Sequence, residues 1–144
     1  MMPIVHAARR WIGTPYRHQS SCLGAGCDCL GLILGVWTEV VGDIPETLPA
    51  YSPDWSEPQN SETLFDAALR HFEIKPVANA EAGDLLLFRM RDGAVAKHLG
   101  IQSRIGSNAS FIHSYSGHGV VESRLTDPWA RRIVARFKFP IKVT

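Results

Sequence analysis

Cys29, His98 and His113 have the residue types needed for nucleophilic catalysis by a thiol. A thiol becomes a useful nucleophile near neutral pH when a helix start stabilises its thiolate and a neighbouring imidazole takes its proton. Cys29 opens an apolar run that predicts a buried helix, and Asp28 is a residue type that caps helix N-termini. We therefore expect Cys29 to be the one cysteine of the chain that is mostly thiolate near pH 7.

The two histidines lie in short segments that predict strands, close enough in the chain for the strands to be neighbours. In that arrangement His98 would accept the Cys29 proton, and His113 would fix the tautomer and orientation of His98. Backbone N–H groups at the helix start would hold the oxyanion. Spacing alone does not select this pair, because the chain contains other histidines: His6, His18, His71 and His118.

The first half of the chain predicts helices and loops. Gly13, Thr14 and Pro15 end the first helix, because proline cannot continue it. The helix that Cys29 opens is apolar on every side, and its two glycines would let another element approach closely. The predicted segments are a helix over 4–12, a loop over 17–28, a helix over 29–37 with Gly31 and Gly35, a proline-rich loop over 43–60 and a helix over 64–72.

The second half of the chain predicts strands. After Asp84 the apolar period changes, and Gly, Asp and Asn separate short segments rich in strand-forming residues. The predicted strands cover 85–88, 98–101, 110–113, 119–122 and 133–137. Helices followed by hairpin-linked strands predict one α+β domain over 1–144, in which N-terminal helices pack on an antiparallel β-sheet.

Composition narrows the function classes. Hydrophobic residues make up 45% of the 144 residues and charged residues 20%, which is typical of a globular domain. Lys and Arg number 15 against 14 Asp and Glu, so no overall positive field indicates a nucleic-acid partner. The longest apolar window is too short for membrane insertion, and the N-terminus does not resemble a signal peptide. Three cysteines within eight residues cannot all pair, which favours synthesis and retention in a reducing compartment.

Five segments, in order along the chain, resemble the motifs of NlpC/P60 cysteine peptidases. Asp28-Cys29-Leu30-Gly31-Leu32 resembles the nucleophile motif, and His98-Leu99-Gly100-Ile101 resembles the catalytic-histidine strand. The other three are Gly13-Thr14-Pro15-Tyr16, Ala82-Gly83-Asp84-Leu85-Leu86-Leu87-Phe88 and Phe111-Ile112-His113-Ser114. The resemblance implies a papain-like fold and hydrolysis of peptide bonds in a bacterial peptidoglycan stem or cross-link, without a cofactor.

Carried over position by position, the resemblance gives each site residue a role. It makes Cys29 the nucleophile, His98 the base and His113 the orienting residue. It makes Tyr16 a contact for the oxyanion or substrate, and Asp28 a residue that helps to bind the substrate. Many relatives have Ser after the nucleophile where this chain has Leu30, which cannot form a hydrogen bond. Recognition of a free L-Ala amine is therefore not expected.

A phage-tail subgroup of the family is similar at three further places: the stretches GCDCLGL, LPAYSPDW and KHLGI. This similarity implies a component of a phage-like or gene-transfer-agent tail tip, which opens the wall during DNA entry and is delivered by the particle. A basic C-terminal stretch and the proline-rich loop over 43–60 would dock it on tail-hub proteins. The basic residues are Arg131, Arg132, Arg136 and Lys138.

Three other interpretations compete with this one. Cys22, Cys27, Cys29 and His18 could hold a metal, although their spacing lacks a paired C-x2-C arrangement. The chain could be a catalytically quiet structural component of a tail hub that keeps the fold. It could also be another papain-like amidase or acyltransferase, which a long apolar substrate-binding segment would favour.

Overall fold

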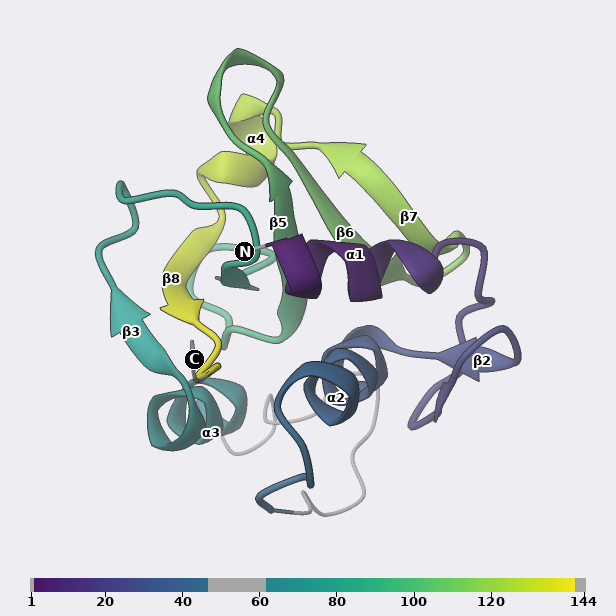
Figure 1. Ribbon diagram of the computed structural model, residues 1–144. Helices are drawn as coiled ribbons and strands as arrows, with labels where there is room; N and C mark the ends of the chain where they lie inside the picture. Colours follow the sequence, from purple (N-terminus) through teal and green to yellow (C-terminus); the bar gives the residue numbers. More distant parts are fainter. Residues whose placement is uncertain (1, 47–61, 142–144) are drawn as a thin grey trace.

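The computed structural model describes residues 2–46 and 62–141. Its helices are α1 (Met2–Arg10), α2 (Cys29–Val40), α3 (Thr63–His71) and α4 (Asp127–Ala130), with a 3-10 turn over Gly106–Asn108. Its strands are β1 (Ser21–Cys22), β2 (Gly26–Cys27), β3 (Glu73–Lys75), β4 (Leu85–Phe88), β5 (His98–Arg104), β6 (Ser110–Tyr115), β7 (Gly119–Arg124) and β8 (Ile133–Lys138). Figure 1 shows how they are arranged.

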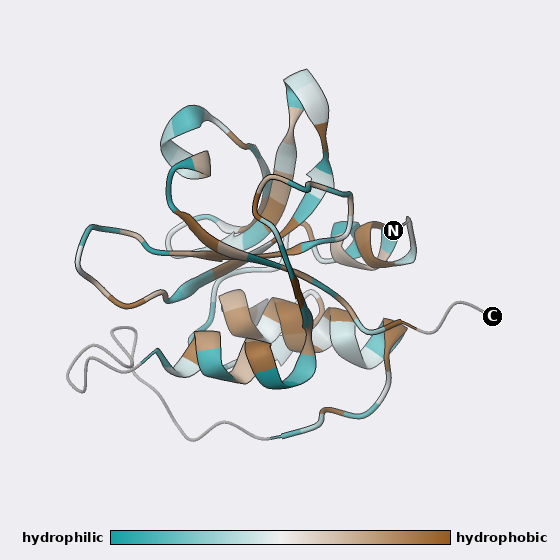
Figure 2. Ribbon diagram, turned by 90° about the vertical axis from the view of Figure 1, so that its left-hand side faces the viewer, coloured by the Kyte–Doolittle hydropathy of each residue, from teal (hydrophilic) through white to brown (hydrophobic). Residues whose placement is uncertain are grey.

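A six-stranded antiparallel sheet in the order β3-β8-β4-β5-β6-β7 forms the centre of the fold. Figures 1 and 2 show α2 and α3 lying together against one side of this sheet. The expectation of an α+β domain with helices packed on an antiparallel sheet is confirmed. Strand β8 comes last in the chain but lies between β3 and β4, so the sheet order does not follow the sequence.

Helix α1 buries one face and ends early. Ile4 and Ala8 lie on the buried face, as the helical spacing predicts. The helix ends at Arg10, two residues before the predicted boundary, and a turn follows. Gly13 then adopts a φ of +94°, a left-handed conformation that suits glycine, and its N–H donates to the Val120 carbonyl. This bond joins the end of the first helix to β7.

Helix α2 is the buried centre of the helical layer, and its glycines have the role that the sequence predicts. A Cβ atom on Gly35 would lie 2.1 Å from the Trp11 ring, and one on Gly31 would lie 1.9 Å from the Ser20 carbonyl oxygen. Both glycines are therefore required by close neighbours. Leu32 and Val36 are fully buried against the sheet side of the core.

The two faces of the sheet have separate cores. On the helix-facing side, Leu87, Ile101 and Ile112 belong to the main cluster with α1 and α2. On the other side, Phe88 and Phe111 form a smaller aromatic cluster. Its ring contacts extend to His98, His113 and Trp129. His98 and His113 therefore lie on the side of the sheet opposite the main cluster, where Trp129 of α4 packs against both rings.

Candidate active site

Asp28 builds the start of α2. It has an extended backbone with φ of −98° and ψ of −172°, and its Oδ1 accepts the Gly31 N–H at 2.7 Å. Its Oδ2 accepts the Gln19 N–H, also at 2.7 Å. One buried carboxylate thus holds both the first helical turn and the preceding loop. Cys29 follows directly, so the position of its side chain is set by this cap.

The Cys29 sulfur lies against the main chain of β5 on both sides of His98. The thiol donates to the Lys97 carbonyl at 3.7 Å, and the Leu99 N–H donates toward the same sulfur. The backbone ladder between β5 and β6 begins only at Ile101 and Ile112. The start of α2 therefore fits beside a part of β5 that does not yet pair with β6.

His98 and His113 are joined directly across these two strands. The His98 Nε2 and the His113 Nδ1 are 2.7 Å apart, and both side chains are buried. On its other ring nitrogen, the His113 Nε2 lies 3.0 Å from the Ser123 Oγ of β7. The predicted pairing of the two histidines on neighbouring strands is therefore confirmed, and the chain of contacts continues one residue further than the sequence suggested.

Aromatic side chains enclose the histidine pair. The Trp129 ring centroid lies 5.7 Å from that of His98 and 5.2 Å from that of His113. Tyr115 lies 6.0 Å and 5.5 Å from the same two rings. Such an apolar enclosure disfavours a charged imidazole. Burial lowers the pKa of His98 to about 3 and that of His113 to about 4, with neighbouring His113 and His118 as the respective second causes.

The expected thiolate is not what the structure favours. Burial and then the charge of Asp28 raise the pKa of Cys29 to about 12, although N–H groups of Leu99, Leu30 and Cys29 itself lower it. With both groups shifted away from charge, the resting pair is a neutral thiol beside a neutral imidazole. The sequence-based expectation that Cys29 is mostly thiolate near pH 7 is therefore wrong, because desolvation outweighs the helix start.

Tyr16 lies close to the nucleophile. It forms a parallel bridge with Cys27, two residues before Cys29. Burial, followed by the negative charges of Cys29 and Asp28, raises the pKa of its phenol. The hydroxyl therefore stays protonated and can donate a hydrogen bond beside the sulfur. Its role as an oxyanion or substrate contact stays a prediction.

The predicted substrate-binding role of Asp28 also stays a prediction. Both of its oxygens accept backbone N–H groups, and the predicted capping of α2 by Asp28 is confirmed. Cys22 is exposed and Cys27 is buried, with its pKa raised by burial to about 11. Over residues 2–46 and 62–141, the structure shows no group of three or more His, Cys, Asp or Glu side chains placed to hold a metal ion.

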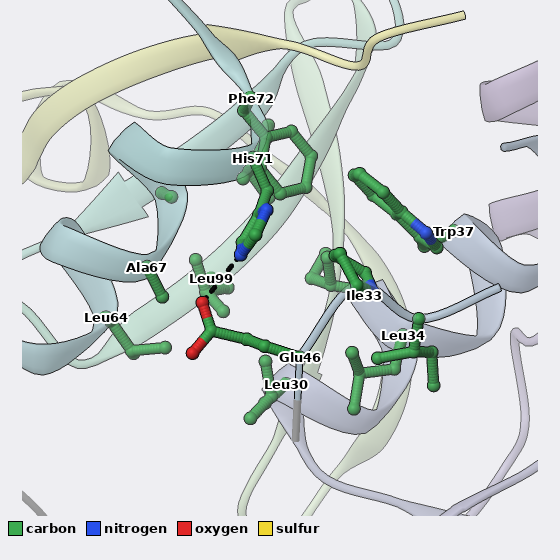
Figure 3. A pocket seen from close by; sticks show the side chains of 14 residues that line it. Leu30, Ile33, Leu34, Trp37, Glu46, Leu64, Ala67, His71, Phe72 and Leu99 are labelled. Atoms are coloured by element: carbon green, nitrogen blue, oxygen red, sulfur yellow. Dashed lines mark hydrogen bonds and ion pairs between the residues drawn. The ribbon is translucent and has the colours of Figure 1, made fainter. Parts of the chain in front are cut away.

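The surroundings of Leu30 are apolar. It is only 8% exposed and lines an apolar pocket between α2 and α3, together with Ile33, Leu64 and Leu99 (Figure 3). At the edge of that pocket, the His71 Nε2 and the Glu46 Oε1 are 2.6 Å apart.

Most of the proline-rich loop over 43–60 lies outside the described residues. The part of the chain that the structure describes contains no helix that is long and apolar enough to cross a membrane.

Two residues of the site were not identified from the sequence. Ser123 carries no sequence signal of its own, because a lone serine on a strand is common. Trp129 carries no sequence signal for a site either, because tryptophans commonly pack in a core, yet its ring packs against both His98 and His113. Only the pairing of β6 with β7 and the turn at α4 bring them to the site, and both depend on the folded sheet.

Comparison with known proteins identifies a family model and solved structures of similar fold. The model of the NlpC/P60 family matches residues 13–137. No curated protein matches the sequence. The NlpC/p60 domain of the peptidoglycan hydrolase SagA has 25% identity and a TM-score of 0.62, over 95% of this chain and 97% of that chain.

Two larger proteins share the fold. An NLP/P60 family protein of Staphylococcus aureus, described as similar to a lipoprotein, has 21% identity and a TM-score of 0.62 over 99% of this chain. An NlpC/P60 family protein of Bacillus cereus has 20% identity and a TM-score of 0.64 over 95% of this chain. The matches cover 41% and 39% of those two chains, so this chain corresponds to only part of each.

Proposed function

The chain belongs to the NlpC/P60 family, and on that premise we propose that it is a cysteine peptidase that hydrolyses peptide bonds of bacterial peptidoglycan. The observation that carries the proposal is the arrangement of three side chains. The Cys29 sulfur lies against the backbone on either side of His98, and His98 in turn contacts His113. This arrangement supports the assignment of Cys29 as nucleophile, His98 as base and His113 as orienting group for acyl transfer.

The reaction begins with a neutral pair. Because the His98 Nε2 is engaged by His113, the nitrogen that receives the thiol proton is Nδ1. As the S–H bond breaks, the sulfur bonds to the carbonyl carbon of the substrate, and the carbonyl oxygen becomes an oxyanion. In this proposal, N–H groups at the start of α2 and the Tyr16 hydroxyl donate hydrogen bonds to that oxygen. The positive charge on His98 and the negative charge on the substrate oxygen therefore develop only as the sulfur attacks.

Collapse of this intermediate breaks the C–N bond. His98 returns its proton to the leaving amine, and the acyl group stays on the Cys29 sulfur as a thioester. A water molecule then attacks the thioester and gives its proton to the same imidazole. The products are a new carboxylate and a new amine, with the thiol restored. No step requires a cofactor or a metal.

The experiment that tests the function is a digest of purified peptidoglycan followed by mass spectrometry. New peptide termini with intact glycan strands are expected, and Cys29→Ala is the matched control without a nucleophile. The SagA domain is described as part of a peptidoglycan hydrolase, which supports this choice of substrate. Release of reducing sugar ends, or no release of fragments, would contradict hydrolysis of peptide bonds in peptidoglycan.

We also propose that the protein is made in the bacterial cytoplasm and incorporated into a phage-like tail. The support is the sequence resemblance of the stretches around Cys29 and His98 to the tail subgroup. Arg131 and Lys138 are exposed and available to a tail-hub protein. Arg136 is not, because it is buried, so it leaves the set of docking residues.

Quantitative mass spectrometry of purified particles tests the tail proposal. Particles should contain the protein, and Arg131→Glu with Lys138→Glu should reduce its amount while the free enzyme keeps its activity. Absence of the protein from particles that assemble normally would contradict the proposal. This result would leave the peptidase activity itself unaffected.

A further inference from the structure

Ser123 ends a chain of side-chain contacts that starts at the base. Its Oγ lies 3.0 Å from the His113 Nε2, and the His113 Nδ1 lies 2.7 Å from the His98 Nε2. In the β6–β7 ladder His113 pairs with Val121 and Phe111 with Ser123, so Ser123 is the diagonal neighbour of His113 on the same face. The sheet therefore fixes this contact.

Each imidazole in this chain has one proton. The aromatic enclosure keeps both rings neutral at pH 7, so each has one N–H donor and one bare nitrogen acceptor. A hydrogen bond between two such rings can run in either direction. Only one direction leaves a bare nitrogen on the side of His98 that must accept a proton.

The productive direction can be followed from the thiol outward. For the His98 Nδ1 to accept the Cys29 proton, the ring proton of His98 must be on Nε2. That N–H donates to the His113 Nδ1, so the proton of His113 must be on its own Nε2. The His113 N–H then needs an acceptor, and the Ser123 Oγ is in place to accept it.

The opposite direction switches the base off. If Ser123 donated to the His113 Nε2, the His113 proton would be on Nδ1 and would point at the His98 Nε2. His98 would then carry its proton on Nδ1, the nitrogen that must receive the thiol proton. The same four atoms would remain in contact, but no proton could move from Cys29 to His98.

We propose that Ser123 is a positioning residue that accepts the His113 N–H and thereby holds His98 in the tautomer able to deprotonate Cys29. The inference depends on the assignment of His98 as base, which belongs to the proposed function. It does not depend on the identity of the peptide that is cleaved. In the transition state the same contacts support the positive charge that develops on His98, because the His113 Nδ1 accepts its Nε2–H.

The test uses two measurements that need no peptide substrate. Long-range ¹⁵N–¹H correlation spectra of the full chain report which ring nitrogen of each histidine is protonated. Peptide-resolved alkylation by iodoacetamide reports the rate at which Cys29 reacts. The wild type should show His98 and His113 both protonated on Nε2. A wild-type His98 protonated on Nδ1 would overturn the proposal.

The variants distinguish a role of the Ser123 hydroxyl in fixing the histidine tautomers from a general role in stabilising the fold. Ser123→Ala should lose the single tautomer of His113 and slow Cys29 alkylation on the order of fivefold, while Ser123→Thr, which keeps the hydroxyl, should behave like the wild type. Ser103→Ala is the matched control, because this buried serine of β5 bonds to the Ser110 hydroxyl at 2.7 Å and not to an imidazole. If Ser123→Ala does not fold, Ser123→Cys offers a side chain of similar shape and much weaker acceptor strength.

Two results would contradict the inference. Unchanged tautomers and alkylation in Ser123→Ala would show that His113 orders itself without the hydroxyl. An equal loss in Ser103→Ala would show that any buried serine matters as much. A failure of the peptidoglycan digest, with these spectra and rates as expected, would instead contradict the proposed substrate alone.

Discussion

The sulfur of Cys29 lies 3.7 Å from the backbone oxygen of Lys97, the residue before His98. The Cys29 thiol is therefore held against the main chain that carries His98, and the N–H of Leu99 contacts it from the other side of His98. Backbone contacts of this kind do not depend on side-chain rotamers. Substitutions around the site should thus change proton transfer more than they change the position of the sulfur.

Cys29→Ala should abolish hydrolysis and leave the protein folded. Loss of the nucleophile should reduce the rate of peptidoglycan digestion by about a thousandfold or more, whereas the loss of one small, partly buried thiol should cost only about 1 kcal/mol of unfolding free energy. Rates of muropeptide release and denaturant unfolding measure the two effects. Cys22→Ala, an exposed cysteine on β1, is the control and should remain active. Equal damage from both substitutions would favour the metal-site interpretation.

Acid should destabilise the protein through its buried histidines. The pKa of His98 falls from 6.5 to about 3 and that of His113 from 6.5 to about 4 on folding. Between these values and pH 6.5 the unfolded chain binds more protons, so stability is fully present above pH 6.5 and is lost as the pH falls. Each ring should contribute a loss of ~3 kcal/mol by about pH 3 to 4.

Thermal or denaturant unfolding across this pH range tests the histidine effect. His98→Gln should make the free energy of unfolding less dependent on pH, because it removes one buried imidazole. The same depressed pKa values predict that hydrolysis, assayed before unfolding, has no acid limb near pH 6.5. A clear loss of activity with a midpoint there would show that His98 titrates as an ordinary solvated imidazole.

Leu30 predicts a preference for cross-linked wall. Its side chain lines the apolar pocket between α2 and α3 and offers no hydrogen bond to a free amine. Intact cross-linked sacculi should therefore be cut at least as fast as free tripeptides in parallel digests. Leu30→Ser should lower the unfolding free energy by about 2 to 4 kcal/mol, because it removes a buried leucine. A strong preference of the wild type for free-amine tripeptides would contradict the prediction.

Arg136 should matter for stability and not for docking. It is 3% exposed, its guanidinium donates to Asp84 and Gln102 at 2.9 Å, and it donates to the Val77 carbonyl at 2.8 Å. Arg136→Ala would leave the Asp84 carboxylate buried with Lys75 as its remaining ion-pair partner, at a cost of about 3 kcal/mol or more. The exposed Lys138 is the matched control, and Lys138→Ala should change the unfolding free energy by no more than about 0.5 kcal/mol.

Local signals allowed the helix and its nucleophile to be predicted from the sequence. Asp28 caps the same helix that it was expected to cap, and the strands of His98 and His113 are neighbours because one short connection joins them. The α+β fold followed from these elements and their order, and the family followed from the resemblance of the five motifs. Each of these features depends on residues that are close in the chain.

The remaining features depend on the folded sheet. Strand β3 is three residues long and largely exposed, and only its pairing with β8 defines it. The short β1–β2 hairpin and α4 were likewise absent from the predicted elements. Ser123 reaches His113 through strand pairing, and the protonation of Cys29 depends on burial that no local pattern reveals.

The place of β8 in the sheet has a consequence for synthesis of the protein. Strand β4 and the Asp84 that precedes it leave the ribosome well before Arg136, yet β4 needs β8 as one of its two neighbours. Until residue 138 has emerged, β4 has an unpaired edge and the Asp84 carboxylate lacks its guanidinium. The sheet around β5 should therefore be complete only after β8 has left the ribosomal exit tunnel. We expect the nascent chain to have no peptidase activity before that point.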